Sequence, residues 1–189
     1  MNKHILLSAL AGVAVSAAAF SSVHEPAREK KLRVVIIRHG EKPTDKEAYN
    51  LSCKGMNRAL QLPNVLYQKF GKPDFVYVPS LTCDTFTDHA RMFQTVSPFA
   101  IRYDLTINSK FGETAHKKLA EDILQKEGTV LLVWEHSAIH HIARKLGVKN
   151  AQPWPDDDFD GIWIIDFTSG IPLWTCDQEG IEPSEDCSF

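Results

Sequence analysis

The chain has 189 residues, 43% of them hydrophobic, which is enough for one domain with a buried core. Its formal net charge at pH 7 is −3, so it lacks the strong positive field by which proteins bind nucleic acid or acidic membrane surfaces. An anion site in this protein must therefore be a local cluster of cationic side chains.

Residues 1–20 have the pattern of a secretory signal peptide. A lysine and a histidine precede an apolar run that ends in small residues, and cleavage after Ala17 or Ala19 fits the small-x-small rule. An uncleaved membrane anchor is the alternative, but the run is short and is interrupted by Ser8 and Gly12. We expect a single mature domain over residues 21–189, periplasmic or secreted, with no membrane association after cleavage.

The rest of the chain alternates apolar runs with helical patterns. The apolar runs predict five strands, at residues 32–38, 74–80, 129–136, 161–167 and 171–176. The last two strands are expected to pair as a hairpin across residues 168–170. Helices are predicted from the cap at Ser52 to the stop at Gly71, through 90–103 from a start at Thr87 or Asp88, and over 113–128 and 137–147. Pro63 is expected to kink or split the first helix.

This alternation predicts an α/β fold, a three-layer α/β/α sandwich with a largely parallel central sheet. In such sheets the functional groups gather beyond the carboxyl ends of the strands. Three predicted strands end in polar residues, namely Arg38–His39, Ser80 and Glu135–His136. The chemistry is therefore expected at this edge of the sheet.

Arg38, His39 and Gly40 form the most informative of these strand ends. A neutral histidine is a nucleophile near neutral pH, and an arginine binds phosphate oxygens through forked hydrogen bonds. Glycine permits a tight turn and a close approach of the backbone to a ligand. The three residues together favour attack on phosphorus.

The surrounding motifs resemble those of the histidine phosphatase superfamily, the phosphoglycerate mutase-like group. RHG follows an apolar strand, the next helix begins with L-S-x-x-G at residues 51–55, Arg91 opens an R-x-x-Q-T motif, and His136 ends the third strand. The resemblance covers residues 33–147. It implies a phosphoglycerate mutase-like fold and a nucleophilic His39, with Arg38, Arg91 and His136 binding the phosphoryl group and no metal or other cofactor.

The sequence departs from the family pattern at two points. Ser137 follows His136 where the family often has glycine, and the group that protonates the leaving oxygen is ambiguous. Glu113 fits the spacing of the mutase-like branch, whereas Glu135 is the rival, although strand alternation would point it away from His136. Glu41 is either a residue that orients Arg38 or Arg91, or a solvated turn residue.

The predicted function is an exported phosphatase that hydrolyses a small phosphorylated substrate through a phosphohistidine. A mutase is less favoured because the region between Arg91 and the third strand is short. Two alternatives stay open: a silent secreted phosphate-binding module, and a metal-dependent hydrolase that uses the i, i+4 pair His136 and His140. Specificity is expected in residues 43–51, 81–88 and 148–160. The Asp156–Asp158 run within the last segment favours a solvated loop, and Trp154 favours packing. The substrate and the oligomeric state are not predicted.

Four cysteines in an exported protein suggest two disulfides. The favoured pairing is Cys176 with Cys187, which would staple the C-terminal tail, and Cys53 with Cys83. Unpaired thiols are the alternative if the chain is not exported.

Overall fold

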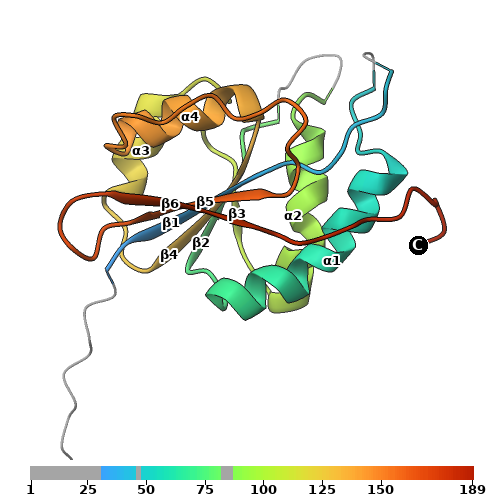
Figure 1. Cartoon of the computed structure of the whole chain (residues 1–189), viewed down its shortest axis with the longest axis horizontal. Coiled ribbons are helices and arrows are strands. Elements are labelled where there is room, and N and C mark those ends of the chain that lie inside the picture. The colour runs from blue at the N-terminus through green and yellow to red at the C-terminus, as the bar shows by residue number, and fades with distance from the viewer. Residues whose placement is uncertain (1–30, 46–47, 82–86) are drawn as a thin grey trace, which may run out of the picture.

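A computed structural model describes residues 31–45, 48–81 and 87–189, and the predicted signal peptide lies outside these residues. One sheet of six strands forms the centre, in the order β3-β2-β4-β1-β5-β6 (Figure 1). In chain order the strands are β1 (Arg33–Arg38), β2 (Phe75–Tyr77), β3 (Ile107–Asn108), β4 (Thr129–Trp134), β5 (Gly161–Asp166) and β6 (Leu173–Gln178). The four helices are α1 (Cys53–Phe70), α2 (Ala90–Tyr103), α3 (His116–Ile123) and α4 (His136–Lys145).

The sheet is parallel over β3, β2, β4 and β1, and antiparallel where β5 joins β1 and β6 joins β5. The predicted largely parallel sheet and the terminal hairpin are confirmed. Strand β1 lies between β4 and β5, which explains why it is apolar without alternation: it is buried on both faces.

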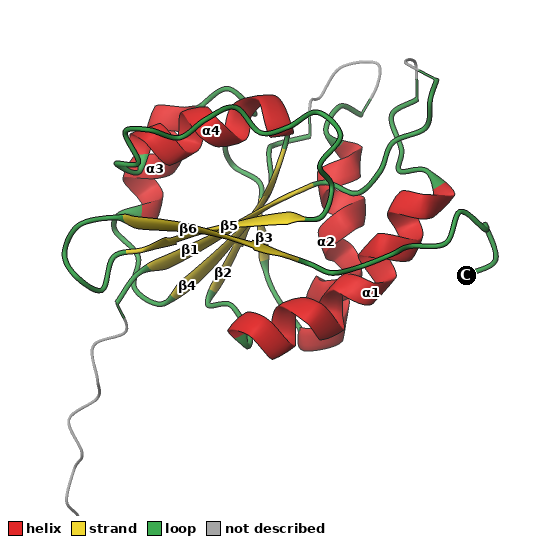
Figure 2. Ribbon diagram, in the orientation of Figure 1, coloured by secondary structure: helices red, strands yellow, loops and turns green. Residues whose placement is uncertain are grey.

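Two apolar cores flank the sheet. Figure 2 shows the helices that cover its two faces. Successive side chains of β1 point to opposite faces, so Val34 and Ile36 pack with α3 and α4, whereas Val35 and Ile37 pack with α1 and α2. The three-layer α/β/α sandwich predicted from the alternation of elements is therefore confirmed.

Some local features differ from expectation. Pro63 lies inside α1 without splitting it, and Pro98 likewise lies inside α2. Helix α3 begins at His116 rather than at Glu113, and His89 rather than Thr87 or Asp88 precedes α2, in the left-handed conformation. The two-residue strand β3 was not predicted, because so short a run carries no periodic signal.

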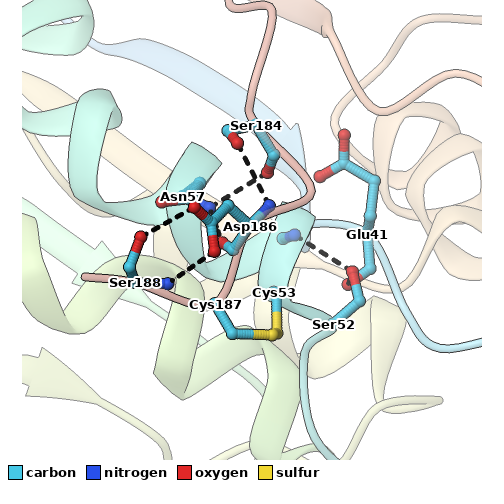
Figure 3. Close-up of a disulfide and its surroundings, with 9 residues drawn as sticks. Glu41, Ser52, Cys53, Asn57, Ser184, Asp186, Cys187 and Ser188 are labelled. Carbon is cyan, nitrogen blue, oxygen red and sulfur yellow. Dashed lines mark hydrogen bonds between the residues drawn. A yellow bond between two sulfur atoms is a disulfide. The ribbon is translucent and has the colours of Figure 1, made fainter.

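The predicted disulfide pairing is wrong. Cys53 at the start of α1 bonds to Cys187 in the C-terminal tail, and Cys176 is a free, exposed thiol (Figure 3). The extended strand β6 carries Cys176 away from Cys187, and the tail then turns back across α1, where Asn57 donates to the carbonyls of Ser184 and Asp186. Cys83 lies outside the described residues.

Within the residues that the structure describes, none of the helices is both long enough and apolar enough to cross a membrane.

Candidate active site

The RHG turn is held by its neighbours on three sides. The backbone N–H of His39 donates to the carbonyl of Trp134 at 3.2 Å, and that of Gly40 donates to the hydroxyl of Thr95 at 2.9 Å. A Cβ atom on Gly55 would lie 2.2 Å from the carbonyl oxygen of Glu41. The glycine of the L-S-x-x-G motif is therefore required for the first turn of α1 to pack against the backbone that follows His39.

The ring of His39 is fully buried, and its orientation is defined by two acceptors. Nδ1 lies 2.7 Å from the carbonyl oxygen of Gly40, and Nε2 lies 3.1 Å from Oε2 of Glu135. A carbonyl can only accept, so Nδ1 carries a proton. Nε2 is consequently the nitrogen that can become the nucleophile once it is free of a proton.

Glu135 lies between β4 and α4 and contacts two histidines. Its Oε2 accepts from His39, and its Oε1 accepts from Nδ1 of His136. Burial raises the pKa of Glu135, but hydrogen bonds and charge from His39 and His136 outweigh this effect and bring the pKa to about 2. The alternation argument that pointed Glu135 away from His136 was wrong, because β4 ends at Trp134 and Glu135 already caps the next helix.

Arg38 is enclosed by the loop that precedes β5. Its Nη1 donates to the carbonyls of Asp156 at 2.6 Å and Asp158 at 3.1 Å, and its guanidinium carbon lies 3.8 Å from the centre of the Phe159 ring. Its Nε is buried and has no acceptor among the described residues. Burial lowers the pKa of Arg38, while the charge of Glu135 opposes that shift.

The same loop contributes a carboxylate. Oδ1 of Asp156 lies 3.2 Å from Nε2 of His136, although the Asp156 side chain is 95% exposed. The run of aspartates is thus more than a solvated loop. It reaches the site because β5 is antiparallel to β1, which places the start of β5 beside the end of β1, where Arg38 and His39 lie.

Arg91 of α2 lies at the rim. Its Nη1 donates to the carbonyl of Ala48 at 2.9 Å, and its side chain lines a cavity of about 480 Å³ with Asp156 and Phe159. The rest of the lining comes from residues after the RHG turn, namely Lys42, Pro43, Thr44 and Asp45. The structure therefore brings Arg38, Arg91, His39 and His136 to one end of the sheet, as predicted, and Glu135 joins the two histidines there.

Glu113 occupies a turn ahead of α3 and is half-buried. Its backbone carbonyl accepts from Nε1 of Trp134 at 3.0 Å, which ties this turn to the residue that precedes Glu135.

The carboxylate of Glu41 binds Arg58, and it does not orient Arg38 or Arg91 as one of the two predictions for this residue had it. Both of its carboxyl oxygens accept from the buried Arg58 of α1, which also donates to Asp160 at 2.9 Å and to Glu179 at 2.6 Å. Sequence reasoning missed Arg58. The available signal was its position on the buried stripe of α1, between Gly55 and Leu62, where an arginine requires buried partners.

The remaining candidates have other contacts. The ring of His140 packs against His141 at 3.8 Å between centroids, and His141 stacks on His116, whereas His136 faces Glu135 and Asp156. Trp154 is buried, 5.0 Å from the ring of Trp163, so its predicted packing role is confirmed.

Neither a protein-family model nor a curated protein matches the sequence. Solved structures do match. An alpha-ribazole-5'-P phosphatase candidate from Escherichia coli aligns at 14% identity and TM-score 0.57, over 80% of this chain and 100% of that chain. The protein histidine phosphatase SixA, complexed with tungstate, aligns at 16% identity and TM-score 0.54, over 78% and 97%.

A mycobacterial glucosyl-3-phosphoglycerate phosphatase with inorganic phosphate aligns at 13% identity and TM-score 0.54, over 79% of this chain and 99% of that chain. These proteins are all members of the histidine phosphatase superfamily. The chain therefore has the phosphoglycerate mutase-like fold of the histidine phosphatase superfamily.

Proposed function

We propose that the protein is an exported phosphatase that hydrolyses a phosphate monoester through a phosphohistidine at His39, without a metal ion. One observation carries the proposal. His39 commits Nδ1 to Gly40, which leaves Nε2 as the nitrogen that can attack, and both His39 and Arg38 lie against the ring of Phe159. The buried Nε of Arg38 has no acceptor among the described residues. A buried donor of this kind suits an anionic ligand such as a phosphoryl oxygen.

The first half-reaction transfers the phosphoryl group to the enzyme. Nε2 of His39 attacks phosphorus, the bond from phosphorus to the ester oxygen breaks, and the leaving oxygen takes a proton. Arg38, Arg91 and His136 stabilise the negative charge on the three phosphoryl oxygens. Two steps with lower barriers thereby replace one difficult hydrolysis.

The proton comes from a glutamate. Sequence spacing favours Glu113, whereas contacts with both His39 and His136 favour Glu135, and we propose Glu135 as the donor. In the resting site the ionised Glu135 holds a proton on Nε2 of His39. Movement of that proton to Glu135 frees Nε2 for attack on phosphorus. It also leaves Glu135 protonated, so that Glu135 can then donate the proton to the leaving oxygen.

The second half-reaction returns the enzyme to its starting state. Water attacks phosphorus, the phosphorus–nitrogen bond breaks, and a glutamate accepts the proton that the water loses. Inorganic phosphate then leaves. Two of the similar structures support a small phosphorylated substrate: the glucosyl-3-phosphoglycerate phosphatase, which holds inorganic phosphate, and the alpha-ribazole-5'-P phosphatase candidate.

Export is supported by two features. Residues 1–20 have the signal peptide pattern, and the Cys53–Cys187 disulfide is of a kind that persists in oxidising compartments. We propose that cleavage leaves a mature chain that starts at Ala18 or Phe20 and contains the domain of residues 21–189. Mass spectrometry of the periplasmic or secreted protein should find its N-terminus after Ala17 or Ala19, and an intact Met1 in that fraction would contradict the proposal.

The test of the catalytic proposal is hydrolysis of p-nitrophenyl phosphate by the purified protein, with and without EDTA. His39→Ala is expected to lower kcat by at least about 1,000-fold, and EDTA to have no effect. The exposed His141 supplies the control, since His141→Ala should keep full activity. An acid-labile, base-stable phosphoprotein should form in wild type and in His141→Ala, and not in His39→Ala.

Full activity in His39→Ala would exclude this histidine as the nucleophile, and loss of activity in EDTA would support the metal-dependent alternative. Phosphate binding without turnover of any ester in a broad panel would support the silent binding module.

A further inference from the structure

We infer that Asp156 competes with phosphate for His136, and so weakens the binding of both substrate and product. This inference rests on the proposed phosphate site. The Asp156 carboxylate contacts Nε2 of His136 at 3.2 Å, and a phosphoryl oxygen can bind that nitrogen only in its place.

Both nitrogens of His136 are engaged by carboxylates. Nδ1 contacts Glu135, and Nε2 contacts Asp156. For His136 to donate to a phosphoryl oxygen, one carboxylate must leave. The Glu135 side chain is 18% exposed and also holds His39, whereas the Asp156 side chain is 95% exposed. Asp156 is therefore the group that is displaced at the lower cost.

The position of Asp156 fits this role. His39 is fully buried and Arg38 is 1% exposed, so a phosphate approaches from the side where His136 is partly open to solvent. Asp156 lies on that side and lines the cavity that Arg91 also lines. Its backbone is held separately, because its carbonyl accepts from Arg38 at 2.6 Å. The carboxylate thus stays near the site after it gives up His136.

The consequence is that the protein binds its substrate and inorganic phosphate more weakly, and by a similar factor. A phosphate ester and inorganic phosphate both need the same nitrogen, and both are repelled by the displaced carboxylate nearby. The contact between Asp156 and His136 therefore raises KM and also weakens inhibition by the product phosphate. Both effects arise because the contact opposes the bound substrate and the bound product, and not the transition state alone.

The experiment compares Asp156→Asn with Asp157→Asn in the purified protein at about 0.15 M salt, where distant charges are screened. Asp157 is the neighbouring exposed aspartate, so the control removes the same charge one residue away. We expect Asp156→Asn to lower KM for p-nitrophenyl phosphate and the inhibition constant of inorganic phosphate by about three- to fivefold, the size of an exposed ionic contact. Asp157→Asn should leave both constants unchanged.

An unchanged or higher phosphate inhibition constant in Asp156→Asn would overturn the inference and make Asp156 a residue that orients His136. Equal shifts in both variants would overturn it too, as a general charge effect. Phosphate affinity from calorimetry needs no turnover and therefore separates the two proposals. Activity in His39→Ala would end the phosphohistidine mechanism, yet tighter phosphate binding by Asp156→Asn would still support competition at His136. Absence of phosphate binding in wild type and variant alike would overturn the competition at His136, whereas turnover of p-nitrophenyl phosphate that His39→Ala abolishes would still support the phosphohistidine mechanism.

Discussion

Glu135 links the two histidines of the site through its two carboxyl oxygens. Because its pKa is about 2, Glu135 is ionised at neutral pH in the resting site and accepts from both rings. His39 then donates from both nitrogens, to Gly40 and to Glu135. At the residue scale, the proposed mechanism thus begins with the movement of one proton between His39 and Glu135.

If Glu135 is the proton donor, the effect of its removal should depend on how much the leaving group of the ester needs a proton. Glu135→Gln is expected to lower kcat by about 100- to 10,000-fold for an alkyl phosphate, whose leaving oxygen needs a proton. The loss should be smaller for p-nitrophenyl phosphate, whose leaving group departs as an anion. The measurement is the ratio of kcat values for the two esters in wild type and in the variant.

Glu113→Gln is the matched comparison for this prediction. If Glu135 is the proton donor, Glu113→Gln should keep the ratio of wild type. A change of ratio in Glu113→Gln alone would return the role to Glu113, the residue that sequence spacing favoured.

At the scale of elements, the first turn of α1 supports the turn formed by Arg38, His39 and Gly40. Ser52 caps the helix by accepting from the N–H of Gly55, and both its backbone N–H and its hydroxyl donate to the carbonyl of Glu41. Figure 3 shows that the Cys53–Cys187 disulfide joins the C-terminal tail to this same turn. The tail therefore braces the helix end against which the residues after His39 pack.

The disulfide should add substantially to stability, because it closes a loop with a sequence separation of 134 residues. Replacement of Cys53 and Cys187 by serine is expected to lower the free energy of unfolding by about 2–4 kcal/mol, measured by urea denaturation. Cys176→Ser is the control and should have no effect, since this thiol is free and exposed. Equal stability of the double variant and wild type would contradict the prediction.

At the scale of the whole molecule, Arg58 joins three distant segments. It holds Glu41 after the RHG turn, Asp160 at the end of the loop that encloses Arg38, and Glu179 at the start of the tail. Burial lowers the pKa of Arg58, but its contacts with Glu41 and Glu179 outweigh this effect and raise it. One arginine thus faces three carboxylates in a largely buried cluster.

Glu179 is the carboxylate that this cluster keeps neutral. Burial raises its pKa from 4.5 to about 8, although the charge of Arg58 opposes that shift. Between these two values the folded state holds a proton that the unfolded state has lost. The contribution of Glu179 to the free energy of unfolding is therefore full below about pH 4.5 and is lost as the pH rises towards 8.

Glu179→Gln removes this titration. Relative to wild type, the variant should gain at least about 1 kcal/mol in free energy of unfolding between pH 5 and about pH 8.5, measured by denaturation at each pH. Glu182→Gln, an exposed position in the same tail, should follow the wild-type curve. Parallel curves for Glu179→Gln and wild type would show that Glu179 is ionised throughout.

Local patterns in the chain were enough to place the sheet, the helices and the strand ends that carry Arg38, His39 and His136. Strand and helix periodicity depend on neighbouring residues, and parallel strands bring their carboxyl ends to one edge whatever the details of packing. The L-S-x-x-G motif was also recognisable in the sequence, but the close packing of its glycine against the backbone of Glu41 is a finding of the structure.

Other features required the folded chain. The pairing of Cys53 with Cys187 follows from the path of the tail after β6, and the approach of Asp156 to His136 follows from the antiparallel placement of β5. Glu135 reaches both histidines because β4 ends one residue before it. Most of these contacts join segments that are far apart in the sequence. Local sequence patterns do not show which distant segments meet, so the packing of the whole domain decides these contacts.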